Sequence, residues 1–102
     1  MSAFRVGFAP EALDLVEEIR AWWLVNRRAN PRLFDDELRA AWRRVGGAPH
    51  AGQPYPHPRV PGVRRVLMPR SRYHVYYVTD EAAGHVWILA IWHVARGGQP
   101  PL

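Results

Sequence analysis

The chain has 102 residues, of which 48% are hydrophobic and 23% are charged, so it forms one globular domain rather than a disordered or low-complexity chain. It contains no cysteine, which excludes a disulfide scaffold, a zinc site with thiolate ligands and a cysteine nucleophile. The net charge is +5 and all 14 basic residues are arginine, which favours nucleic acid or an acidic protein as partner, although a GC-rich coding bias also explains the lack of lysine.

The first 47 residues predict one strand followed by two helices. Residues 4–8 (FRVGF) alternate apolar and other side chains, which is typical of a short strand. Residues 9–26 predict a helix, because a proline suits its first turn and its apolar side chains recur on one stripe. Residues 30–47 predict a second helix with Asn30 as its N-cap and the glycine pair Gly46–Gly47 at its end. Few residues separate the helices, so we expect an antiparallel hairpin.

The rest of the chain predicts a proline-rich loop, three strands and a tail. Residues 48–62 hold five of the ten prolines, which indicates a stiff loop. Residues 63–68, 72–79 and 85–94 predict strands that short turns connect into a meander. The last strand is apolar at nearly every position, as a central strand covered on both faces would be. Residues 95–102 form the C-terminal tail.

The predicted fold class is α+β, in a single domain over residues 1–102 with the element order β-α-α-β-β-β. A four-stranded, mainly antiparallel sheet can bury one face against the helical hairpin. Because successive strand residues point to opposite faces, one of the adjacent Arg64 and Arg65 is expected to point away from the helices.

The N-terminal segment predicts no targeting signal. Arg5 and Pro10 leave no apolar stretch of signal-peptide length, and the longest apolar run falls far short of the roughly 20 residues that a membrane helix needs. We therefore expect a soluble, cytoplasmic protein that does not contact a membrane.

Several segments together resemble a known family. They are the helix APEALDLVEEIRAWW, the second helix leading into GGAPHAG, the strands GVRRVLM and RYHVYYV, and the terminal VWILAIWHVARGG. Their order over about residues 4 to 97 is similar to that of the RelE/ParE superfamily of type II toxins. The positions that carry the similarity are Pro49–Gly52, Arg64, Tyr76, Tyr77, His93 and Arg96.

The resemblance implies a small growth-inhibiting protein that a cognate antitoxin, encoded beside it, neutralises. Such antitoxins wrap an extended segment and a helix over the sheet and the helical hairpin, and operator DNA is reached only through the antitoxin. RelE-like members cut mRNA on the ribosome by attack of a 2′-hydroxyl on the adjacent phosphate. ParE-like members cut nothing and block DNA gyrase through protein contacts. Neither activity implies a cofactor.

Candidate site residues follow from these two activities. If the chain is a ribonuclease, Arg64, His93 and Arg96 are the expected catalytic residues, because cations stabilise the phosphorane and a histidine can exchange protons at neutral pH. Expected contacts with the target or with nucleic acid are Arg65, Arg72 and Tyr76, for which ordinary sheet packing is the alternative role of the tyrosine.

Three other histidines are weaker candidates. His74 could also exchange protons, although a solvated position in the strand explains it equally well. His50 and His57 lack a third ligand, so no metal site is expected.

The tail departs from the pattern of the RNA-cutting relatives. Those proteins usually carry a tyrosine, or a tight basic and aromatic cluster, just after the last strand, whereas HVARGGQPPL contains no tyrosine and the chain contains no lysine. This favours the non-cleaving, ParE-like branch with DNA gyrase as the target. A metal-independent, ribosome-dependent mRNA endoribonuclease and an inactive member that only binds its antitoxin remain the alternatives.

Overall fold

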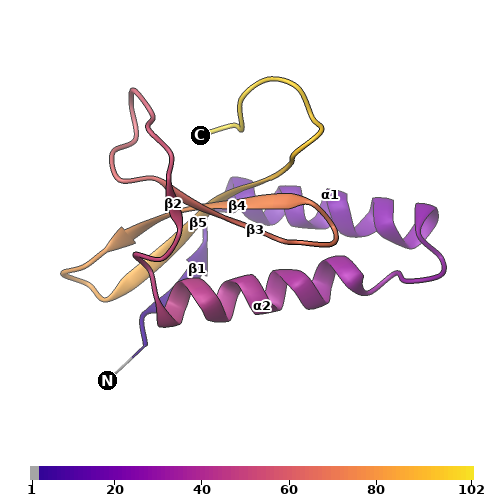
Figure 1. Cartoon of the computed structure of the whole chain (residues 1–102), viewed down its shortest axis with the longest axis horizontal. Coiled ribbons are helices and arrows are strands. Elements are labelled where there is room, and N and C mark those ends of the chain that lie inside the picture. The colour runs from indigo at the N-terminus through magenta and orange to yellow at the C-terminus, as the bar shows by residue number, and fades with distance from the viewer. Residues whose placement is uncertain (1–2) are drawn as a thin grey trace.

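The computed structural model describes residues 3–102 and contains two helices and a five-stranded sheet (Figure 1). Strand β1 (Arg5–Phe8) precedes helices α1 (Pro10–Asn26) and α2 (Leu33–Gly47). The remaining strands are β2 (Gln53–Pro54), β3 (Arg64–Leu67), β4 (Tyr73–Asp80) and β5 (His85–His93). The strand order is β1-β5-β4-β3-β2, with β1 parallel to β5 and the other pairs antiparallel. The predicted α+β class and the helical hairpin on one face of the sheet are confirmed.

Two details differ from the prediction. The expected four-stranded sheet has a fifth strand, β2, inside the proline-rich loop, where Gln53 and Pro54 pair with β3. A proline is tolerated there because β2 is an edge strand. The prediction that Asn30 caps the second helix is wrong, since α2 begins at Leu33 with Arg32 in the N-cap position. The carbonyl oxygen of Asn30 accepts the N–H of Leu33 at 3.3 Å, so these residues form a separate turn before the helix.

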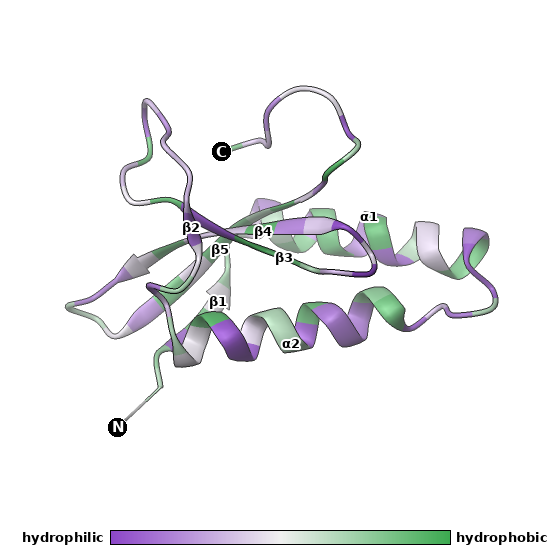
Figure 2. Ribbon diagram, in the orientation of Figure 1, coloured by the Kyte–Doolittle hydropathy of each residue, from purple (hydrophilic) through white to green (hydrophobic). Residues whose placement is uncertain are grey.

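The main core lies between the sheet and the two helices. Figure 2 shows hydrophobic and hydrophilic stretches alternating along both helices, as expected of helices that bury one face. The buried residues come from α1, α2, β4 and β5 above all, and include Ala12, Val16, Trp23, Phe34, Leu38, Val45, Tyr73, Val75, Tyr77, Val86, Ile88 and Ile91. Trp22 is apolar like its neighbour Trp23, yet it is 44% exposed, because adjacent helical residues diverge around the axis.

A β-bulge in β5 changes which face of the sheet its residues occupy. Tyr76 pairs with Ala90 whereas the next residue, Tyr77, pairs with Ile88, so Leu89 is an extra residue. Before the bulge, Val86 and Ile88 face the helices. After it, Ile91 and His93 face the helices instead, opposite Val75 and Tyr73.

A second, smaller core covers the opposite face of the sheet. Its buried members are Val63, Tyr76 and Ala90, and residues of the proline-rich loop and the tail, among them Tyr55 and Leu102, pack against them. In Figure 1 both of these segments rise from the side of the sheet that α2 does not cover. The last strand is therefore covered on both faces over part of its length, as its composition predicts.

Tyr77 fastens the start of the proline-rich loop to β4. Its hydroxyl donates to the carbonyl oxygen of Pro49 at 2.8 Å and accepts the N–H of Gly52 at 3.1 Å. Burial raises the pKa of Tyr77 above its ordinary value, so the phenol stays protonated. The backbone of Gly52 comes so close that a Cβ there would lie 2.2 Å from the Tyr77 hydroxyl oxygen.

Gly52→Ala is therefore expected to lower the free energy of unfolding by about 2 kcal/mol or more, because the added methyl group overlaps the tyrosine. Urea denaturation measures the change. Gly47→Ala is the matched control, since no atom lies within 4 Å of a Cβ at that position. A Gly52→Ala protein as stable as the control would contradict the proposed fastening.

Candidate functional site

His93 occupies the end of β5 on the helix side of the sheet. Its ring lies edge-on to Tyr73, with the ring centroids 4.9 Å apart. The N–H of Ala95 donates to His93 Nδ1 at 3.0 Å, so the neutral imidazole carries its proton on Nε2. In this geometry the Nδ1 lone pair of His93 is engaged by the backbone, and Nε2 is the nitrogen left to donate a hydrogen bond.

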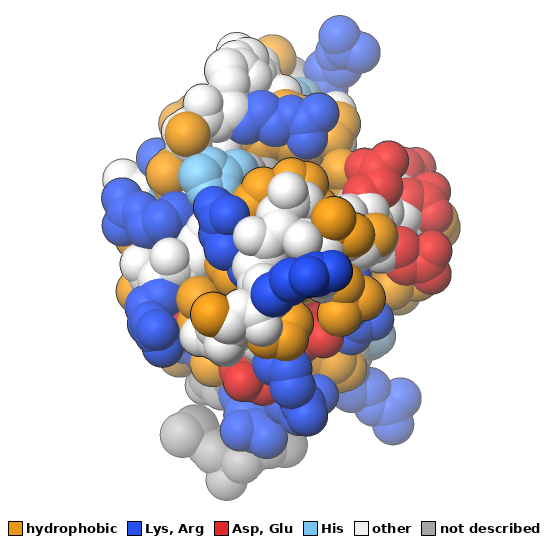
Figure 3. Space-filling model, turned by 90° about the vertical axis from the view of Figure 1, so that its right-hand side faces the viewer, with side chains coloured by type: hydrophobic (Ala, Val, Ile, Leu, Met, Phe, Trp, Pro, Cys, Tyr) orange, Lys and Arg blue, Asp and Glu red, His pale blue; other side chains and the backbone are white. Residues whose placement is uncertain are grey.

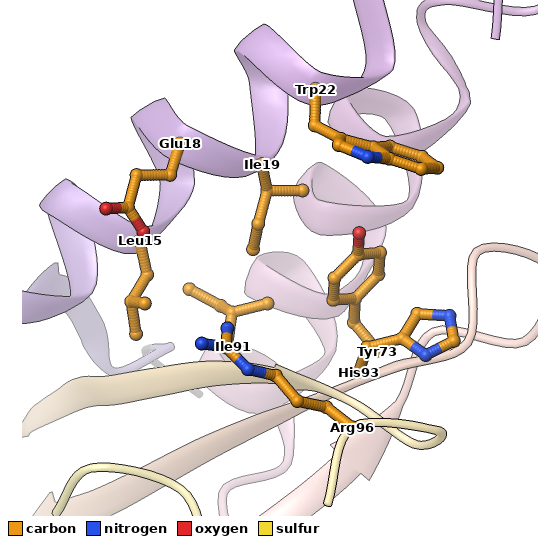
Figure 4. Close-up of a pocket in the computed structure, with 8 residues that line it drawn as sticks. All are labelled: Leu15, Glu18, Ile19, Trp22, Tyr73, Ile91, His93 and Arg96. Carbon is orange, nitrogen blue, oxygen red and sulfur yellow. The ribbon is translucent and has the colours of Figure 1, made fainter. Parts of the chain in front are cut away.

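Arg96 lies close to His93 but is engaged by an aromatic ring. Its guanidinium carbon is 3.9 Å from the centroid of the Trp92 ring, which is a cation–π contact. His93 and Arg96 both line a cavity of about 270 Å³ between α1 and the end of β5 (Figure 4). Figure 4 also shows the Tyr73 hydroxyl pointing toward Trp22.

Arg64 is remote from this pair. It is opposite Tyr77 in the sheet, whereas His93 is opposite Tyr73, and four residues along a strand span about 13 Å. The Arg64 guanidinium donates to the carbonyl oxygen of Gly52 at 2.8 Å. The structure therefore brings His93 and Arg96 together and places Arg64 at the anchored loop.

Arg65 points away from the helices, as strand alternation predicts for one of the two arginines. Its Nη1 donates to the Tyr76 hydroxyl at 3.3 Å and its Nε donates to Gln53 Oε1 at 3.0 Å. Tyr76 is only 3% exposed, so its ring supports Arg65 and offers little open surface for stacking. Arg65 and Arg96 line a cavity of about 180 Å³ on this face, together with Tyr55, His74, Tyr76, Trp92, His93, Val94, Gly98 and Pro100.

His74 is a titratable group outside the expected catalytic set. Burial, followed by the positive charges of Arg65 and Arg72, lowers the pKa of His74 below its ordinary value. The imidazole is therefore neutral at pH 7 while it lies beside two cations. This arrangement depends on the pairing of β3 with β4, which the sequence alone does not fix.

Arg72 lies on the turn between β3 and β4 and faces a different cavity from Arg65. Its φ angle is +67°, in the left-handed region that favours glycine, at a cost of about 1 kcal/mol. With Arg27, Arg70 and other residues it lines a cavity of about 480 Å³ at the end of α1. The predicted contact residues are thus divided between the two faces of the sheet.

Glu37 is a structural contributor that the sequence did not reveal. One carboxylate oxygen accepts the N–H of Ser71 at 2.7 Å, and the carboxylate also accepts the N–H of Arg70 at 3.0 Å. These contacts hold the β3–β4 turn against α2. The residues are 33 and 34 positions apart, so no local pattern could have identified the contact.

Over residues 3–102, no group of three or more His, Asp or Glu side chains is placed to hold a metal ion. Neither described helix is long and apolar enough to cross a membrane. Figure 3 views the molecule from the end that carries the α1–α2 connection, where arginine and hydrophobic side chains interleave and acidic side chains gather mainly at one margin.

Comparison with known proteins identifies related sequences and folds. Residues 6–97 match the model of a family described as the ParE toxin of the type II toxin-antitoxin system parDE. The sequence matches no curated protein.

Three solved structures share the fold. A chain of the chromosomal ParDE toxin-antitoxin system from P. aeruginosa has a TM-score of 0.70 at 15% identity, covering 90% of this chain and 97% of that one. A chain of the RelBE2 toxin-antitoxin complex from Mycobacterium tuberculosis has a TM-score of 0.67 at 21% identity, covering 94% and 97%. The isolated E. coli RelE toxin has a TM-score of 0.57 at 15% identity, covering 93% and 88%.

The lowered pKa of His74 predicts a loss of stability in mild acid. Because the folded chain disfavours the protonated imidazole, the unfolded chain binds the proton more readily. The free energy of unfolding should be fully retained above the ordinary histidine pKa of 6.5 and should fall as the pH drops from there through the lower folded pKa. Urea denaturation at pH 7.5 and 5.5 measures this loss. The free energy of unfolding of His74→Gln should fall less between the two pH values than that of the parent. Equal losses in the two proteins would show that His74 is not the responsible group.

Proposed function

The chain belongs to the ParE toxin family of type II toxin-antitoxin systems, and from this premise we propose that it arrests growth by binding DNA gyrase and that a cognate antitoxin neutralises it. The observation that favours binding over RNA cleavage is the placement of Arg64, His93 and Arg96, which do not form one catalytic group. Binding needs no such group, only a fixed surface of complementary shape and charge.

Cleavage by the expected residues would need a base, an acid and a cation around one phosphate. His93 Nδ1 accepts the Ala95 amide, and Arg96 lies over the Trp92 ring. Arg64 is hydrogen-bonded to the Gly52 carbonyl, at a position about 13 Å along the strand from that of His93. Such an arrangement suits a rigid protein-binding edge, in which arginine and aromatic side chains are held in fixed positions.

The outer side of the helical hairpin suits an antitoxin. Leu13 on α1 and Trp42 on α2 are 50% and 44% exposed, and both line a cavity of about 260 Å³ between the helices. Arg20 and Arg39 border the same cavity, and because Arg20 pairs with Asp35 at 2.6 Å, a partner carboxylate would meet Arg39 above all. An amphipathic segment with apolar residues flanked by carboxylates complements this surface. Two of the similar structures are of toxin-antitoxin systems, which agrees with such a partner.

A ribosome-dependent ribonuclease is the second candidate, and one observation favours it. Arg65, His74 and Arg96 line the same cavity on the sheet face opposite the helices, and the pKa of His74 is lowered. A neutral histidine beside two arginines could accept a proton from a 2′-hydroxyl while the cations stabilise the phosphate. This candidate makes His74, and not His93, the base.

Purified toxin should inhibit the supercoiling of relaxed plasmid by DNA gyrase, with complete inhibition at a sufficient molar excess, because tight binding removes active enzyme. His74→Gln should inhibit within about threefold of the parent, since the proposal assigns it no chemistry. If the parent protein leaves supercoiling unchanged at a large excess, the gyrase assignment is wrong.

The antitoxin encoded beside the toxin gene should bind Trp42→Glu about 30-fold more weakly than the parent, because an exposed aromatic side chain in a groove is a typical hot spot of binding energy. Titration calorimetry with the purified antitoxin measures the affinity. Trp87→Glu is the matched control, since Trp87 is 41% exposed on β5, away from the hairpin. An equal loss in both variants would argue against docking on the hairpin.

A further inference from the structure

We propose that the cavity between the end of α1 and the β3–β4 turn binds a nucleoside monophosphate, a phosphate monoester that carries an aromatic base. The cavity has a volume of about 480 Å³, which is large enough for such a ligand. It is separate from the Arg65–His74–Arg96 cavity on the other face of the sheet, and the proposal does not depend on the target of the toxin.

The polar side chains that line this cavity are largely hydrogen-bond donors. The cavity is lined by Arg27, Arg70 and Arg72, whose guanidinium groups donate hydrogen bonds and cannot accept them. The Tyr73 hydroxyl accepts from Trp23 Nε1 at 3.2 Å, so its own proton remains to be donated. In His93, Nδ1 accepts the Ala95 amide, so Nε2 is the ring nitrogen left to donate. A ligand that satisfies these groups must be rich in acceptor oxygens and negatively charged, as a phosphate monoester is.

The conformation of Arg72 supports the same conclusion. A left-handed residue at this turn would be least strained as glycine, yet the chain has an arginine with φ +67°. The carbonyl oxygen of Arg72 accepts the N–H of Val94 at 2.9 Å, so the strained residue is also fixed to the segment that follows β5. Its side chain therefore borders the cavity from a fixed backbone position.

Trp22 gives the cavity a preference for a phosphate that carries a planar ring. It is 44% exposed and lines this cavity as well as the neighbouring one. The guanidinium carbon of Arg27 lies 4.8 Å from the Trp22 ring centroid, which fixes the position of both side chains. Because Arg27 covers one face of the indole, a base can stack on the other face while its phosphate reaches Arg70 and Arg72.

Carboxylates near the cavity do not cancel this charge. Glu37 lies under the turn, but its oxygens are taken by the N–H groups of Arg70 and Ser71. Glu18 lines the adjacent cavity and not this one. Glu37 keeps its negative charge when it accepts these N–H groups, but three arginines line the cavity, so the positive charge there exceeds it.

Titration calorimetry of the purified full chain with AMP tests the proposal, with inorganic phosphate and adenosine as the two half-ligands. AMP is expected to bind at least about tenfold more tightly than either, because only it uses both the arginines and the indole. Trp22→Leu should reduce the affinity for AMP to that for phosphate. Arg72→Gly should weaken AMP binding about tenfold, whereas its urea midpoint should stay equal or rise because glycine relieves the left-handed backbone.

Matched controls distinguish this cavity from the rest of the protein surface. Trp87→Leu and Arg59→Gln, which change an exposed tryptophan and an exposed arginine elsewhere, should bind AMP as the parent does. His74→Gln should also leave AMP binding unchanged, and a loss in that variant would place the ligand in the other cavity and overturn the proposal. AMP that binds no better than phosphate, or an acidic aromatic peptide that binds while AMP does not, would also overturn it.

Discussion

The extra residue Leu89 in β5 determines which face of the sheet each end of that strand presents. In an unbroken strand, residues of one parity share a face, so His93 would lie on the face opposite Val86 and Ile88. The bulge shifts the register between Tyr76 and Tyr77 and returns Ile91 and His93 to the helix side. His93 therefore contacts Tyr73, and both side chains line the two cavities beside α1.

Several arginines near the ends of β4 and β5 are divided between the two faces of the sheet. Arg65 lies beside the neutral His74 on one face, whereas Arg27, Arg70 and Arg72 gather at the end of α1. His93 borders the cavities on both sides of the sheet. The proposed target and ligand surfaces are therefore separate regions of one domain.

The element order and both helices could be predicted because each is encoded locally, by apolar spacing and by the residues at its ends. The prediction of an N-cap at Asn30 failed because the carbonyl of this residue accepts a hydrogen bond in a turn that precedes the helix. Strand β2 consists of two residues that only pairing with β3 defines. The bulge could not be seen because β5 is apolar on both faces, which hides the change of parity. Glu37 and the Arg65–His74 pairing depend on contacts between distant segments, so the candidate site was only partly predictable.

The most direct test of a toxin that binds rather than cuts is induced expression of the chain without antitoxin, with growth followed and mRNA 5′ ends mapped across reading frames. We expect growth arrest with intact messages and a DNA-damage response, because gyrase is blocked while RNA is untouched. New 5′ ends at codon-phased positions would contradict this mechanism and would make the chain a ribonuclease. Unimpaired growth of cells that contain the folded protein would contradict both activities.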